Sequence, residues 1–217
     1  MTRILRSLTV ATALAALSGV VALAVPKPSP FPKSWELKFR CDAPKRIMVT
    51  LPDRKTPQAF WYMTFTVANE TKDEQQFLPT FDMLAADGSI LRSDRGVPTA
   101  VFDAIKAREK DKFLEPLTKI TGRLLRGADQ ARDGVAIWPE PDRKMGKFSV
   151  FVAGLCGECE FYRVVNGEYE KVEKIEMDAD GKPKEELILL RKTLQLNYEA
   201  AGDTDKAEPL GQEWVMR

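Results

Sequence analysis

The feature that most constrains the fold is a two-residue alternation of side chains, which is clearest over residues 60–67. Every second residue of this segment shares one face, and the large apolar members of that face are Trp61, Met63, Phe65 and Val67. The turn-forming run Asn69-Glu-Thr-Lys-Asp follows directly and ends the pattern. An α-helix would need apolar residues three and four positions apart, so the alternation predicts a β-strand.

Short segments of the same character recur along the chain between turn signals such as Asp87-Gly88. They are residues 35–39, 46–51, 76–84, 120–125, 135–138, 148–152 and 187–198. Strands and helices do not alternate along the chain, as a parallel sheet would require. The pattern therefore predicts a mainly β fold, an antiparallel β-sandwich formed by one domain over residues 33–217.

One segment, near residues 97–115, breaks this rhythm. Pro98 suits the first turn of a helix, and Val101, Phe102 and Ile105 then recur at helical spacing until Pro116 ends the pattern. We expect one short helical insertion that packs over a sheet edge or an open end of the sandwich.

A hydrophobic strand leads into an asparagine turn at Trp61-Tyr-Met-Thr-Phe-Thr-Val-Ala-Asn69-Glu-Thr, and Phe77-Leu-Pro-Thr-Phe81 and Ala86-Asp-Gly88 follow. This order resembles the immunoglobulin-like sandwich domains of uncharacterised secreted bacterial proteins. The resemblance implies an immunoglobulin-like fold and export, and it carries no catalytic residues. The cysteine–tryptophan–cysteine spacing of antibody domains is not met, because Cys41 precedes Trp61 and the next cysteine is Cys156.

The N-terminal segment has the pattern of a signal peptide over residues 1–24. Arg3 and Arg6 precede an uncharged run over residues 8–25, and Ala22-Leu-Ala24 supplies the small residues that a signal peptidase recognises. An uncleaved membrane anchor is the alternative, because this run is at the lower limit of a spanning length. Four prolines then make residues 25–32 a proline-rich leader, which we expect to be an extended spacer. The chain is thus expected to be secreted or periplasmic, in the cell envelope, and to meet a membrane only through an uncleaved N-terminus.

Composition excludes several classes of activity. No histidine occurs among the 217 residues, which removes Ser-His-Asp and Cys-His catalysis and histidine-ligated metals. The net charge of +1 creates no overall field that would attract nucleic acid. We therefore expect no catalytic site, no cofactor and no nucleic-acid partner.

Acidic residues provide only weak metal motifs. A calcium loop beginning at Glu176 would place Leu187 where a bidentate glutamate is required, so metal binding is not expected there. A second acidic group could bind calcium in a loop, although a solvated loop is the simpler interpretation, and it consists of Asp129, Asp133, Glu140 and Asp142. Asn69-Glu-Thr71 is a glycosylation triplet that we interpret as a turn.

The cysteines are the only group of residues in the sequence whose spacing suggests chemical reactivity. Cys41, Cys156 and Cys159 are an odd set, and the last two form a C-x-x-C motif. Gly157-Glu158 suits a two-residue type II′ hairpin turn, whose flanking residues are close enough for a disulfide between Cys156 and Cys159. Two free thiols, a redox-active pair and a zinc site that includes Cys41 remain as alternatives.

Aromatic side chains on the outer faces of the strands are the last candidates. Phe60 and Tyr62 lie opposite Trp61, and Phe151 lies opposite Val150. If a helix covers them, they belong to the core. If they are open, Phe60, Tyr62 and Phe151 form an interaction face for a protein or a sugar ring.

These observations leave three functional classes. The favoured one is an exported non-enzymatic module of the cell envelope, with an interaction or structural role and an unidentified envelope protein as its partner. A carbohydrate-binding module that recognises a polysaccharide is an alternative. A thiol–disulfide protein that uses residues 156–159 is the other.

The signal-peptide interpretation predicts that the mature chain begins at Val25. Intact mass spectrometry of the protein recovered from its native envelope should show the loss of residues 1–24. A full-length mass would contradict this expectation and would indicate an uncleaved anchor or a cytoplasmic protein.

Overall fold

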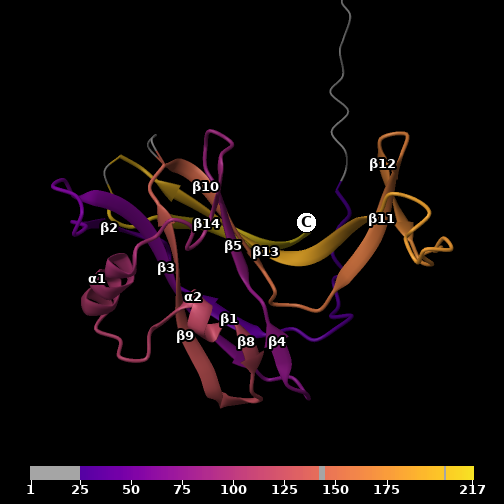
Figure 1. Cartoon of the computed structure of the whole chain (residues 1–217), viewed down its shortest axis with the longest axis horizontal. Helices are drawn as coiled ribbons and strands as arrows, with labels where there is room; N and C mark the ends of the chain where they lie inside the picture. The colour runs from indigo at the N-terminus through magenta and orange to yellow at the C-terminus, as the bar shows by residue number, and fades with distance from the viewer. Residues whose placement is uncertain (1–24, 142–144, 203) are drawn as a thin grey trace, which may run out of the picture.

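The structure is a computed structural model of the chain, and it describes residues 25–141, 145–202 and 204–217 (Figure 1). The segment interpreted as a signal peptide lies outside the described residues. In the part that is described, no helix is long and apolar enough to cross a membrane. Residues 25–32, the proline-rich leader, form neither helix nor strand.

The first layer is a five-stranded sheet built around one long strand, β3 (Gln58–Asn69). β9 (Gly127–Pro139) pairs with one edge of β3, and β1 (Lys38–Cys41) and β2 (Lys45–Val49) share the other edge. A two-residue strand, β7 (Glu115–Pro116), adds to β9 in the parallel direction. In the register of β3 and β9, Trp61 lies opposite Trp138.

The second layer is a seven-stranded antiparallel sheet built around β13 (Ile188–Ala200). Its other strands are β5 (Thr80–Leu84), β6 (Ile90–Arg92), β10 (Gly146–Ala153), β11 (Cys159–Val165), β12 (Glu168–Val172) and β14 (Glu208–Met216). β14 lies along one edge of β13, while β10 and then β11 follow each other along the opposite edge. A small ribbon outside both sheets pairs β4 (Gln75–Phe77) with β8 (Gly122–Leu124).

The hydrophobic core lies between the two large sheets. The inward face of β3 is the one that the alternation predicted, and Trp61, Met63 and Phe65 are all buried on it. The second sheet contributes the facing layer, which includes Phe81, Phe148, Val150, Leu194 and Leu196. Phe65 and Phe81 meet across the layers with ring centroids 4.8 Å apart. The mainly β, antiparallel architecture predicted from the sequence is confirmed.

The inserted helix α1 (Thr99–Glu109) covers the outer face of the five-stranded sheet. It begins after Pro98 and ends at Lys110, which has the left-handed φ of 56°. Val101 and Ile105 are fully buried in a second cluster that also contains Phe60 and Tyr62. The part of β3 around Phe60 and Tyr62 is therefore buried on both faces, on one by the other sheet and on the other by α1.

The structure differs from the expected strands in two places. Residues 120–125 end a short helix, α2 (Leu117–Ile120), before they form β8. β14 was not expected, because Pro209, Gly211 and several charged residues interrupt any apolar alternation there.

β11 and β12 form a wing that extends beyond the packed sheets, at the right of Figure 1. Its inner side carries a small cluster of buried residues, Tyr162, Leu190 and Met216. Tyr162 and Tyr169 meet edge to face in this cluster, with ring centroids 6.1 Å apart. The wing therefore has its own small core next to the end of the sandwich.

Asn69 stabilises the turn that ends β3. Its side chain is fully buried, and Nδ2 donates to the backbone oxygens of Asp73 at 2.9 Å and Leu124 at 3.1 Å. Its Oδ1 accepts from the backbone N–H of Thr71 at 3.0 Å and from the Thr71 hydroxyl at 2.7 Å. The amide is engaged inside the fold, which confirms that the Asn69-Glu-Thr71 triplet is a turn.

We predict that Asn69→Ala lowers the free energy of unfolding by about 3 kcal/mol, because four hydrogen bonds are lost and two backbone oxygens lose a buried partner. Urea denaturation monitored by tryptophan fluorescence measures this loss. The matched control is Gln76→Ala, which removes an exposed amide from β4 and should change stability by less than about 0.5 kcal/mol. Equal losses in the two variants would contradict the role given to Asn69.

Candidate functional site

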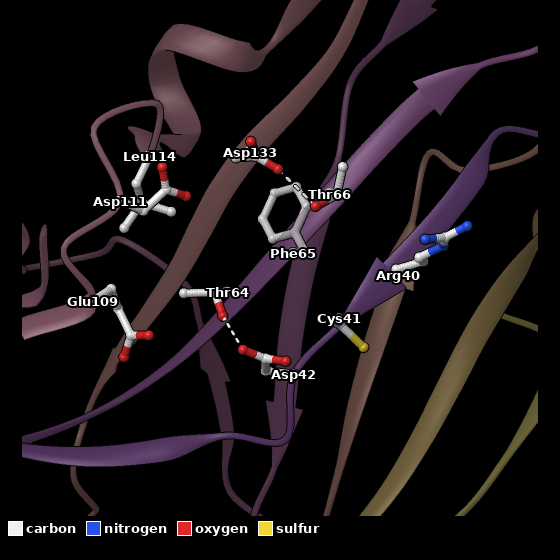
Figure 2. Close-up of a pocket in the computed structure, with 10 residues that line it drawn as sticks. All are labelled: Arg40, Cys41, Asp42, Thr64, Phe65, Thr66, Glu109, Asp111, Leu114 and Asp133. Atoms are coloured by element: carbon white, nitrogen blue, oxygen red, sulfur yellow. Dashed lines mark hydrogen bonds between the residues drawn. The ribbon is translucent and has the colours of Figure 1, made fainter. Parts of the chain in front are cut away.

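The candidate site is an open cleft of about 520 Å³ on the outer face of the five-stranded sheet (Figure 2). It lies where the cover provided by α1 ends. Its lining residues are Arg40, Cys41, Asp42, Thr64, Phe65, Thr66, Glu109, Asp111, Leu114 and Asp133.

The floor of this cleft is polar because the outward-facing side chains of β3 change from aromatic residues to threonines beyond the end of α1. Phe60 and Tyr62 lie under α1, whereas the next residues on the same face are Thr64 and Thr66. The Thr64 hydroxyl donates to Asp42 Oδ2 at 2.9 Å, and the Thr66 hydroxyl donates to Asp133 Oδ1 at 2.6 Å. These bonds hold two carboxylates at the sides of the cleft, as Figure 2 shows.

Glu109, the last residue of α1, forms the junction between the cleft and the buried helix contact. Its carboxylate accepts from the Tyr62 hydroxyl at 2.6 Å and from Lys45 Nζ at 3.0 Å. Burial acts to raise the pKa of Glu109, but the hydrogen bonds from Tyr62 and Lys45 outweigh it, and the pKa lies below its ordinary value. Burial and the Glu109 carboxylate raise the pKa of Tyr62. At neutral pH the carboxyl is therefore ionised and the phenol protonated.

The lining of the cleft is strongly acidic. Four carboxylates contribute to it and Arg40 is the one basic lining residue, although Lys45 lies beside the cleft and pairs with Glu109. Lys45 also lies 3.6 Å from Asp42, so the cleft has an excess of acidic groups and not a single charge sign. Such an excess in a concave surface favours ligands of the opposite sign. Among the described residues, no cluster of histidine, cysteine, aspartate or glutamate has the arrangement of a metal site. Chemically, an excess of carboxylates in a concave surface can bind a cationic group, such as a lysine or arginine side chain.

Sequence reasoning singled out two residues of this cleft, Asp133 in the acidic group and Cys41 among the cysteines, and it did not predict that they share a site. The other residues are brought together by the end of α1, the end of β1 and the middle of β3, which are far apart in the chain. The polar pair Thr64 and Thr66 on an otherwise aromatic face was the one available signal that the helix cover stops there.

The acidic group considered for calcium does not assemble. Asp133 bonds Thr66 in the cleft, whereas Glu140 accepts from Arg46 Nε at 2.6 Å and from Trp61 Nε1 at 3.1 Å. The Asp129 carboxylate accepts from Gln130, and Asp142 lies outside the described residues. The residues that the structure describes therefore do not form the proposed loop site.

The structure bears out the interpretation in which a helix covers Phe60 and Tyr62, so the open interaction face is not formed. Phe60 is 3% exposed and Tyr62 is 0% exposed, because α1 packs on them, as the alternative interpretation required. Phe151 is half-buried on the outer face of the other sheet, where the Arg217 guanidinium lies 4.2 Å from its ring centroid. The three side chains thus lie on opposite sides of the sandwich and form no common surface.

The predicted disulfide between Cys156 and Cys159 is not formed, and all three cysteines are free. β10 and β11 do not pair with each other, so no hairpin brings these two residues together. Gly157 lacks the positive φ that the first central position of a type II′ turn needs. The turn was inferred from local sequence, but β11 pairs with β13 instead.

The three thiols differ in exposure. Cys159 is exposed, Cys156 is buried and Cys41 is partly buried, with its Sγ 3.9 Å from the Tyr198 hydroxyl. Burial raises the pKa of both Cys41 and Cys156. The fraction of reactive thiolate is therefore lowered at these two positions.

Asp94, in the turn before α1, lies outside the cleft and has a carboxyl group with a shifted pKa. Its backbone N–H donates to Ile137 O at 2.7 Å and its φ is 61°. Oδ2 is buried with no hydrogen-bond partner in the described structure. Burial raises the pKa of Asp94 to about 6, although a hydrogen bond from Ser93 acts in the opposite direction.

We predict that Asp94→Asn stabilises the protein by about 2 kcal/mol at pH 7.5 and leaves stability nearly unchanged at pH 4. The folded-state pKa of Asp94 lies above its unfolded value, so ionisation costs stability as the pH rises from about 4 through about 6. Asparagine tolerates the positive φ at this position. Urea denaturation across this pH range measures the difference.

The control variant is Asp103→Asn, which changes an exposed carboxylate on α1. A stabilisation by Asp94→Asn that does not vary with pH, or that Asp103→Asn reproduces, would contradict the assignment.

Comparison with known proteins found no matching family model, no matching curated protein and no matching solved structure.

Proposed function

We propose that this protein is an exported, non-enzymatic interaction module of the cell envelope, with an immunoglobulin-like sandwich as its scaffold. In this proposal the acidic cleft binds a basic segment of another envelope protein. The observation that carries the proposal is the cleft of about 520 Å³ whose lining has four carboxylates and one arginine. Support for the scaffold comes from two antiparallel sheets that share one core.

The ionisation states in the cleft suit binding more than acid–base catalysis. A general acid or base works best with a pKa near the operating pH. Glu109 has a lowered pKa and Tyr62 a raised one, so neither changes its protonation state near pH 7. The hydroxyl donors hold the acidic side chains of Asp42 and Asp133 in fixed positions, which is what recognition of a cationic partner needs.

A protein partner is favoured over a polysaccharide because the cleft offers no aromatic platform. Sugar rings commonly stack on an exposed aromatic side chain. The aromatic residue of the cleft, Phe65, is 3% exposed, and Phe60 and Tyr62 are covered by α1. Thiol–disulfide exchange is also less favoured, because burial raises the pKa of Cys156.

The test is calorimetric titration of the protein with a hexalysine peptide at low ionic strength. We expect Asp111→Asn/Asp133→Asn to weaken binding by about thirtyfold, because each of the two lost charges contributes roughly 1 kcal/mol to an ion pair in contact with water. Asparagine keeps an oxygen that can accept the hydrogen bonds that Asp111 and Asp133 receive. Wild-type binding should weaken as salt is added.

The matched control is Glu176→Gln/Asp178→Asn, which removes two charges from an exposed loop outside the cleft. Binding of this control should stay within about twofold of the wild type, since its charges lie outside the cleft. If peptide binding weakens equally in both variants, the effect is one of overall charge, and this result would contradict the proposal. Absence of peptide binding together with retention on an insoluble polysaccharide would replace it with the carbohydrate-binding alternative.

A further inference from the structure

Residues 29–37, which we call the strap, are docked along the second sheet and are not a free spacer. The backbone N–H of Ser29 donates to Glu158 Oε1 at 2.9 Å. The Lys33 ammonium pairs with Glu160 at 2.9 Å, and Glu36 pairs with Lys192 at 3.1 Å. The strap therefore meets the seven-stranded sheet at the point where the sandwich ends and the wing begins.

Backbone hydrogen bonds also join the strap to the C-x-x-C segment. Leu37 N donates to Leu155 O at 2.8 Å, and Gly157 N donates to Trp35 O at 3.0 Å. Glu36 and Cys156 form an antiparallel bridge between these two bonds. On its other side the segment is held to β13, because Lys192 N donates to Glu158 O at 3.0 Å.

This double attachment keeps the two sulfurs apart. A disulfide needs Cα atoms about 4.4–6.8 Å apart, whereas the two cysteines belong to separate pairings: Cys156 bridges Glu36 of the strap, and Cys159 pairs with Arg191 of β13. Cys159 lies opposite Arg191 on the outer face of the sheet, and it is exposed. Cys156 is buried on the strap side, where the N–H of Glu158 donates to its Sγ at 3.3 Å. Formation of the bond would require a turn at Gly157 and the loss of its bond to Trp35.

Gly157 is compatible with both arrangements. A Cβ on Gly157 would lie 2.4 Å from Ser34 Oγ and 2.4 Å from Trp35 Nε1, so only glycine allows the strap to approach this closely. Glycine also adopts the positive φ that a two-residue turn would need. The same residue thus permits strap docking in one state and a disulfide in the other.

We propose that strap docking and the Cys156–Cys159 disulfide are mutually exclusive, so that the strap keeps the pair reduced and oxidation of the pair releases the strap. This thiol switch goes beyond the proposed binding function and does not depend on it. The coupling is reciprocal: if strap docking makes disulfide formation less favourable by some free energy, the disulfide makes strap docking less favourable by the same amount.

The oxidation is an exchange with a small-molecule disulfide such as oxidised glutathione. The exposed Cys159 thiolate attacks one sulfur of glutathione disulfide, forms a mixed disulfide and releases one glutathione thiolate. After the strap leaves, the Cys156 thiolate attacks the Cys159 sulfur, and the second glutathione leaves as a thiolate. The pair loses two electrons, and glutathione disulfide gains them.

The experiment uses the full chain with Cys41→Ser, so that only the C-x-x-C pair can react. Mass spectrometry after alkylation follows the formation of the internal disulfide in oxidised glutathione. Lys33→Ala/Glu36→Ala removes two ion pairs of the strap. We expect this variant to form the disulfide about tenfold faster than the parent chain, a change that corresponds to about 1.4 kcal/mol.

The control is Lys38→Ala/Glu70→Ala, which removes an exposed ion pair of 2.9 Å on the other sheet and leaves the strap contacts in place. It should oxidise at the parent rate. In the parent chain, oxidation should also increase tryptic cleavage after Lys33 by about tenfold, because release of the strap exposes this bond. Cys159→Ser should abolish that increase.

Two results would overturn the proposal. One is oxidation of the strap variant at the same rate as the parent and the control, including no oxidation of any of them. The other is a parent chain whose disulfide forms while cleavage after Lys33 stays unchanged.

Discussion

Burial of both faces of β3 is the constraint on which the rest of the structure depends. One face, with Trp61 and Met63, fills the space between the two sheets, and the other face, with Phe60 and Tyr62, is covered by α1. Burial of a large aromatic side chain contributes roughly 2–3 kcal/mol, so this strand contributes much of the core stability. α1 packs on this outer face, where Val49 of β2 and Val135 and Ile137 of β9 extend the apolar surface beside Phe60 and Tyr62.

The cleft and the strap are both consequences of where this burial stops. Beyond the end of α1, threonine replaces the aromatic residues on the outer face of β3, and carboxylates from three parts of the chain bind around them. At the end of the sandwich, β10 leaves β13 and the chain resumes as β11, and the strap pairs with the segment between them. Backbone groups that the sheet does not satisfy thus find partners in the strap.

Sequence reasoning was strongest where one residue's environment depends on its near neighbours. The strand at residues 60–67, the turn at Asn69 and the helix after Pro98 follow from local alternation and local turn chemistry. Sequence reasoning failed at Cys156 and Cys159. The Gly157-Glu158 pair between them is as compatible with a segment that joins two strands not paired with each other as with a hairpin turn. The pairing partner of a strand determines which occurs, and a partner thirty residues away leaves no local signal.

The sequence by itself therefore determined the mainly β class, the helical insertion and the apolar face of β3, because periodicity is a property of adjacent residues. Only the tertiary structure decided that Phe60 and Tyr62 are covered, that Phe151 lies on the other sheet and that the thiols stay apart. It also brought Asp42, Glu109 and Asp133 to one cleft. The physical reason is that exposure and proximity depend on which surfaces pack together, and that choice minimises exposed apolar area over the whole chain.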